Sequence, residues 1–153
     1  MITVFPDSNI LVSALIGSAR SAPVVLVDWL AGSRAATLIT GRCCIQEVEK
    51  NFARKLPQAQ PLWQQFVIAS GIRIVPCPRR SIAGIDAKDT AIVAAAVSAA
   101  ATHFVTGDKR LLAEMRAAKS KLPQALTPRE MLETLLAPSA RWWKSRSARR
   151  HAL

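Results

Sequence analysis

The stretch IDAKDTAIVAAAVSAAATHFVTGDKRLL, residues 85–112, decides the fold of this chain. Its alanine-rich apolar middle predicts a buried helix over Lys88–Ala101, and Phe104–Val105 predicts the short strand that follows. Thr106–Gly107–Asp108 then predicts a turn that leads into a helix over Lys109–Lys119. A helix, a strand and a second helix in this order are typical of a protein in which strands and helices alternate.

The same alternation continues outward from this stretch in both directions. Further strands are predicted over Ile2–Phe5, Thr37–Thr40, Ile72–Val75 and Gln124–Leu126. Further helices are predicted over Ile10–Ile16, Val24–Leu30, Arg42–Leu56, Leu62–Ser70 and Glu130–Leu136. This pattern predicts an α/β fold with a mostly parallel sheet that is covered on both faces.

The composition fits one domain with a strongly basic surface. The chain has 153 residues, of which 50% are hydrophobic and 5% aromatic, so a core of Val, Ile, Leu and Ala is expected. Lys and Arg number 21 against 10 Asp and Glu, which gives a formal net charge of +11. This charge favours nucleic acid as a partner, although an acidic protein partner or selection for solubility would explain it as well.

The cysteines and the apolar runs favour a cytoplasmic protein. Cys43, Cys44 and Cys77 are the only cysteines, and no pair of them has C-x-x-C spacing. Neither a disulfide framework nor a zinc site is therefore expected, and the thiols are predicted to be reduced. The N-terminal sequence lacks the features of a signal peptide, and the longest apolar run, residues 91–101, is too short for a membrane span.

Acidic residues follow several of the predicted strands. Asp7 follows the first strand, Glu47 lies early in the helix after the second, and Asp108 follows the fourth. Asp86 and Asp89 open the helix after the third strand. Because ligands bind beyond the carboxyl ends of the strands in an open parallel sheet, we expect these acids at one edge. Each also has a structural interpretation, as a helix cap, a turn residue or a solvated side chain.

Carboxylates that gather at one place need a cation, because their charges otherwise repel and raise their pKa values. Mg²⁺ and Mn²⁺ prefer oxygen ligands, and such an ion can lower the pKa of a water and orient it toward phosphorus. The sequence contains no P-loop, H-E-x-x-H or G-x-S-x-G motif that would indicate another chemistry. The acids therefore predict a site for metal-dependent phosphodiester hydrolysis.

These residues resemble the PIN-domain family, and within it the VapC-like toxin components of toxin–antitoxin systems. The resemblance is carried by VFPDSNILVSAL near the start, by Glu47 within CCIQEVEKNF and by residues 85–112. It implies a three-layer α/β/α sandwich with a central parallel sheet of four to five strands, and a PIN domain over residues 1–137. It also implies an endoribonuclease that depends on Mg²⁺ or Mn²⁺, an antitoxin protein as a possible partner, and a homodimer.

The resemblance assigns a role to each site residue. The family's four acids correspond to Asp7, Glu47, Asp89 and Asp108, which are expected to bind the metal. Asn9 and Thr106 are expected to orient these ligands. Asp86 remains an alternative to Asp89, since the two lie three residues apart.

Pro6 departs from the family pattern, which has an apolar strand residue there. Because proline lacks a donor for the ladder, the first strand is expected to end at Pro6. This departure leaves the direction of the Asp7 side chain open.

Basic residues outside the acid cluster suggest where RNA would bind. Arg79–Arg80 and Lys109–Arg110 flank the acids in sequence and are candidate contacts to the RNA backbone. Residues 138–153 form a basic C-terminal tail by composition, and Arg141–Trp142–Trp143–Lys144 within it combines base-stacking and phosphate-binding side chains. Exposed charges of loops, or a tail that contacts a partner subunit, explain the same residues.

Two other functions use part of this pattern. A non-catalytic RNA- or partner-binding module on a PIN scaffold would keep the fold and the charge without cleavage. A phosphotransfer domain of receiver or dehalogenase type also places an aspartate after its first strand. Dehalogenase-like enzymes need a second acid two residues later, and Asn9 occupies that position here.

Overall fold

Five parallel strands form the centre of the protein, in the order β3-β2-β1-β4-β5. The computed structural model describes residues 1–137, and the basic tail expected over residues 138–153 lies outside this range. The strands are β1 (Ile2–Pro6), β2 (Ala36–Gly41), β3 (Arg73–Val75), β4 (His103–Val105) and β5 (Gln124–Leu126). The predicted parallel α/β sheet is therefore confirmed.

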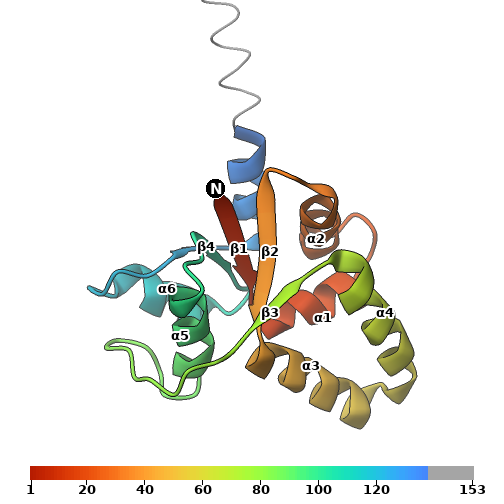
Figure 1. Cartoon of the computed structure of the whole chain (residues 1–153), viewed down its shortest axis with the longest axis horizontal. Coiled ribbons are helices and arrows are strands. Elements are labelled where there is room, and N and C mark those ends of the chain that lie inside the picture. Colours follow the sequence, from red (N-terminus) through yellow and green to blue (C-terminus); the bar gives the residue numbers. More distant parts are fainter. Residues whose placement is uncertain (138–153) are drawn as a thin grey trace, which may run out of the picture.

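Helices cover both faces of this sheet. They are α1 (Ser8–Ile16), α2 (Ala22–Gly32), α3 (Arg42–Lys55), α4 (Gln60–Ser70), α5 (Thr90–Ser98) and α6 (Lys109–Ala117), with a short 3₁₀ turn η1 (Pro57–Ala59). A last helix begins at residue 128 and continues to the end of the described range. α1, α2, α3 and α4 lie together on one side of β1 and β2, and α5 and α6 lie on the other (Figure 1). The predicted three-layer α/β/α arrangement is thus confirmed.

The two central strands are buried on both sides. Val4 and Phe5 of β1 and Phe104 and Val105 of β4 have no exposed surface, as expected for strands that are covered by helices on each face. The rings of Phe5 and Phe104 stack with their centroids 5.5 Å apart. This packing fixes the ends of β1 and β4 relative to each other, which matters because both ends lead into the candidate site.

Strand β1 ends at Pro6, as the sequence predicted, and includes this proline, so it is one residue longer than the predicted range Ile2–Phe5. Pro6 is in register with Val105 of β4, and the next amide, that of Asp7, donates to the Val105 carbonyl at 2.8 Å. The missing N–H of Pro6 faces β2, where the pairing with β1 already ends at Val4 and Leu38. The Thr40 hydroxyl instead donates to the Pro6 carbonyl at 3.1 Å, so proline costs no ladder hydrogen bond here.

Helix α5 is shorter than predicted at both ends. Asp89 occupies its N-cap position, and Ala100 beyond its end adopts φ +56°, a left-handed conformation that is costly for alanine. The amides of Ala100 and Ala101 donate back to the helix, to Val97 and Ala96 at 3.0 Å each. This closing turn resembles a Schellman motif and returns the chain to β4. The alanine-rich sequence gave no sign of it.

The prediction of reduced, unpaired thiols was wrong for two of the three cysteines. Cys43 and Cys77 form a disulfide with an S–S distance of 2.07 Å, and only Cys44 is a free, buried thiol. The bond joins the first turn of α3 to the segment after β3. Gly41 lies against it, because a Cβ on this residue would be 2.6 Å from Cys77 Sγ. Cysteine usage therefore no longer supports a reducing compartment.

The predicted cap of the last helix is confirmed. The Thr127 amide donates to Glu130 Oε1 at 3.0 Å and the Glu130 amide donates to the Thr127 hydroxyl at 3.2 Å, which is the reciprocal pattern of a capping box. None of the helices within residues 1–137 combines the length and apolar character that crossing a bilayer requires.

Candidate functional site

The candidate site lies where the strand order changes direction. From β1 the chain proceeds to β2 and β3 on one side, and afterwards to β4 and β5 on the other. In doubly wound sheets, ligands bind beyond the carboxyl ends of the two strands at such a switch point. Asp7 directly follows β1, and Thr106 directly follows β4. The two residues are hydrogen-bonded to each other, with the Thr106 hydroxyl donating to Asp7 Oδ2 at 3.0 Å.

Asp7 is the most deeply buried acid of the site, with 6% of its surface exposed. It caps helix α1, since its Oδ1 accepts from the Ser8 amide at 2.7 Å. Burial raises its pKa above the usual value; the hydrogen bonds from Ser8 and Thr106 oppose the rise, and the charges of Glu47 and Asp89 add to it. A cation in the pocket would remove the main cost of ionising this carboxyl group.

One pocket of about 380 Å³ collects the acids that the sequence singled out. Its lining residues come from four segments of the chain and are Asp7, Ser8, Asn9, Glu47, Lys88, Asp89, Ile92 and Asp108. All four predicted metal ligands thus reach the same pocket, together with Asn9. Asp86, the alternative to Asp89, does not line it. The roles of these residues as ligands stay a prediction.

Hydrogen bonds to backbone amides and to the Thr106 hydroxyl fix the positions of the acidic residues. Asp108 caps helix α6, and its Oδ1 accepts from the amides of Arg110 and Leu111 at 2.9 and 3.2 Å. Thr106 lies behind the pocket: its hydroxyl accepts from the Asp108 amide at 3.1 Å while donating to Asp7. Asn9 accepts from the Gly107 amide at 3.3 Å, which ties the start of α1 to the turn after β4.

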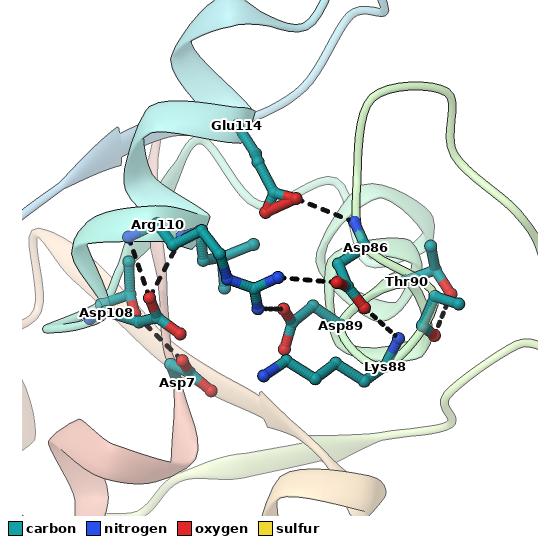
Figure 2. Close-up of polar contacts among 11 residues, drawn as sticks. Asp7, Asp86, Lys88, Asp89, Thr90, Asp108, Arg110 and Glu114 are labelled. Carbon is teal, nitrogen blue, oxygen red and sulfur yellow. Dashed lines mark hydrogen bonds and ion pairs between the residues drawn. The ribbon is translucent and has the colours of Figure 1, made fainter.

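Arg110 forms ion pairs with both acids that precede α5 (Figure 2). Its Nη1 lies 2.7 Å from Asp86 Oδ2, and its Nη2 lies 2.9 Å from Asp89 Oδ2. The two carboxyl groups nevertheless shift in opposite directions. The hydrogen bonds from the Lys88 amide and from Arg110 lower the pKa of Asp86, whereas burial raises the pKa of Asp89 despite Arg110. The difference follows exposure, since the Asp89 side chain is 13% exposed and that of Asp86 40%.

The oxygen atoms of this pocket are of the type that binds a hard divalent cation, but they are not close enough together to coordinate one. Carboxylates and an amide oxygen are the ligands that Mg²⁺ and Mn²⁺ prefer. Within residues 1–137, however, no three His, Cys, Asp or Glu side chains are grouped closely enough to hold one ion as they stand. The arrangement is balanced by cations of the chain itself, because Arg110 pairs with Asp89 and Lys88 lines the pocket.

Sequence reasoning missed the part that these two cations play. Lys88 directly precedes Asp89 and Arg110 follows Asp108 by two residues, so a signal existed in the pattern K-D and D-K-R. The sequence analysis instead proposed Lys109–Arg110 as contacts to the RNA backbone.

The second basic pair proposed to contact RNA was Arg79–Arg80. Arg79 lines another pocket, of about 500 Å³, together with Arg42, Gln46 and the disulfide. No acidic residue lines this second pocket, so its charge is positive.

Comparisons with known proteins agree with the fold. A family model described as PIN domain matches residues 3–110. The fold is similar to that in the crystal structure of VapBC2 from Rickettsia felis bound to a DNA fragment from their promoter. The similarity has a TM-score of 0.60 at 15% sequence identity and covers 82% of this chain and 99% of that chain. A search of curated proteins gave no match.

Proposed function

The chain belongs to the PIN-domain family, and from this premise we propose that it is a metal-dependent endoribonuclease, the toxin of a toxin–antitoxin pair. The observation that carries the proposal is the pocket in which four acids from four segments converge. The chain as a whole carries a net charge of +11, so an acidic pocket on a basic molecule needs a specific reason. A divalent cation that is shared with an RNA phosphate supplies one.

In this proposal Asp7, Glu47, Asp89 and Asp108 hold Mg²⁺ or Mn²⁺. The chemistry that such an ion supplies is activation of water for in-line attack on phosphorus, with stabilisation of the departing oxygen. Thr106 keeps Asp7 and Asp108 at a fixed separation through its one hydroxyl. Asn9 holds the turn after β4 against α1. These contacts are of the kind that orients ligand side chains in metal sites. Cleavage would leave a 5′-phosphate and a 3′-hydroxyl.

RNA would approach along the positive surface beside the acidic pocket. Arg42 and Arg79 line the neighbouring pocket, whose walls also include Ile74, Val75 and Ala91. Gln46 lines this pocket and Glu47, the next residue of α3, lines the acidic one, so both pockets border the same helix. Arginine binds phosphate oxygens with two parallel hydrogen bonds, so these side chains suit an RNA backbone.

We further propose an antitoxin protein as a partner, a homodimer and a place in the cytoplasm. The VapBC2 structure supports the first of these only as a similar fold, since the identity is 15%. The expected RNA-contacting arm lies outside the described residues and adds nothing to the support.

The test is cleavage of RNA oligonucleotides by the purified protein with Mg²⁺ or Mn²⁺ and with EDTA. Asp7→Asn and Glu47→Gln should each abolish or strongly reduce cleavage without unfolding the protein. Glu49→Gln is the matched control, because Glu49 is also exposed on α3 but does not line the pocket. It should cleave at the wild-type rate. Circular dichroism of each variant establishes that it is folded.

Wild-type cleavage by both Asp7→Asn and Glu47→Gln would refute the proposed mechanism. A folded wild-type protein that binds RNA but never cleaves it, whatever the metal and substrate, would favour the non-catalytic RNA-binding module instead.

A further inference from the structure

Arg110 lies where its positive charge would compete with a metal ion for a carboxylate ligand. Its guanidinium group lies between the carboxylates of Asp86 and Asp89, with Glu114 of the same helix nearby (Figure 2). Asp89 is one of the four acids that line the pocket, and Asp86 is not. A cation of the chain therefore binds one proposed metal ligand from outside the pocket.

The surrounding acids hold Arg110 in this position. Its Nη1 donates to Asp86 Oδ2 at 2.7 Å and its Nη2 donates to Asp89 Oδ2 at 2.9 Å. Glu114 Oε1 accepts from the Asp86 amide at 3.1 Å, which fixes the segment that carries Asp86 against α6. Glu114 Oε2 is buried and has no hydrogen-bond partner within the described residues, so its charge adds to the negative potential around the guanidinium group.

The two carboxylates that Arg110 binds differ in what they can do next. Asp86 is 40% exposed and also accepts from the Lys88 amide at 3.0 Å, so it is an anchor that faces solvent. Asp89 is only 13% exposed, so its carboxylate has little contact with water and depends on a partner of the opposite charge. Removal of Arg110 from Asp89 would break the one ion pair that Asp89 forms within residues 1–137, and the carboxylate would need another cation. A divalent ion in the pocket is the replacement that the neighbouring carboxylates favour.

We propose that Arg110 is the internal counter-ion of the acidic pocket, which pairs with Asp89 in the metal-free protein and releases it to an incoming divalent cation. Asp86 keeps the guanidinium group within reach, and so acts as its anchor rather than as a metal ligand. Arg110 is then a positioning residue that competes with the ion for Asp89. This inference rests on the proposed function, because it requires Asp89 to become a ligand. It also accounts for four acids in one pocket of which no three are spaced for an ion.

The test measures Mn²⁺ binding to the protein without RNA, from the electron paramagnetic resonance signal of the free ion. Arg110→Gln replaces the charged, two-pronged donor with a shorter, neutral polar side chain, and the variant should bind Mn²⁺ about three- to tenfold more tightly than wild type. Arg110→Lys keeps the charge without the planar fork and should lie between the two.

Arg116→Gln is the matched control. Arg116 lies on the same helix, is 47% exposed against 44% for Arg110, and pairs with Glu130 at the same 2.9 Å. Its replacement removes a positive charge that does not contact the acids of the pocket, so the affinity for Mn²⁺ should change less than about twofold.

A second measurement needs no variant. The guanidinium ¹H–¹⁵N signals of Arg110 should change as Mg²⁺ is added, over the concentrations at which the ion binds, while those of Arg116 stay constant. Arg110 signals that do not respond to bound Mg²⁺ would overturn the inference.

The outcomes separate the inference from the function on which it rests. Wild-type protein that binds Mn²⁺ and cleaves RNA, together with an Arg110→Gln variant of wild-type or weaker Mn²⁺ affinity, refutes the counter-ion role alone. A wild-type protein that neither binds Mn²⁺ nor cleaves RNA refutes both.

Discussion

The disulfide between Cys43 and Cys77 should contribute a large share of the protein's stability. The two residues are separated by 34 positions. A cross-link that closes a loop of this length lowers the entropy of the unfolded chain by an amount worth about 4 kcal/mol at 25 °C. Unfolding of a chain of this size has an entropy of roughly 0.3 kcal/mol per kelvin, so loss of the bond should lower Tm by about 13 °C.

The measurement compares thermal unfolding of the oxidised protein with that of the reduced protein and of the double variant Cys43→Ser, Cys77→Ser. The last two should melt together, well below the first. Cys44→Ala is the control, because Cys44 is buried but not bonded, so this variant should keep the full difference between oxidised and reduced forms. Thiol titration of the denatured, unreduced protein should find one thiol, and three after reduction.

Two results would refute this reasoning. Three free thiols in protein that was never exposed to a reductant would show that the bond does not form. A single thiol, combined with the same Tm before and after reduction, would show that the bond forms but leaves the unfolded state unconstrained.

Three further predictions concern the site. Asp7→Asn should raise Tm in EDTA, because burial makes the ionised carboxylate of Asp7 costly. Wild type therefore loses stability as the pH rises through the raised pKa of Asp7, so the difference in Tm between variant and wild type should become smaller as the pH falls. Thr106→Val should weaken Mn²⁺ binding by about 10- to 100-fold in a titration, because Asp7 and Asp108 lose their shared hydroxyl. The double variant Arg42→Gln, Arg79→Gln should bind RNA with a weaker salt dependence. The slope of log affinity against log salt concentration, measured by fluorescence anisotropy, should become smaller in magnitude by about 1.4. An unchanged slope would contradict the proposed path.

The residues that gather at the site could be predicted because strand ends are strong signals. Asp7 follows β1 directly and Asp108 lies three residues after the end of β4, so a parallel sheet brings them to one edge whatever the details of packing. Glu47 lies in the second turn of α3 and Asp89 is the N-cap of α5, and their positions follow from the same rule. Their role as ligands remains a prediction.

The features that the sequence did not reveal depend on distances between segments. Cys43 and Cys77 pair because β3 lies beside β2, and no spacing rule connects residues that far apart. Arg110 could have pointed to RNA or to Asp89 with equal plausibility, since both are anions and only the position of the start of α6 relative to the start of α5 decides. The sequence predicted that the first strand ends at Pro6, but it could not show that Pro6 itself pairs with Val105 of β4 while its missing N–H faces a side without a ladder partner.

The absence of a side chain at Gly41 sets a condition on the neighbouring sulfurs. Even a methyl group at this residue would meet Cys77 Sγ at 2.6 Å and Cys43 Sγ at 3.1 Å. An alanine there would press on the bonded sulfurs, whereas two separate thiols could turn away. A substitution at the end of β2 would thus shift the balance between dithiol and disulfide without touching either cysteine. The residue at the end of β2 therefore influences the oxidation state of Cys43 and Cys77 as well as the path of the chain from β2 into α3.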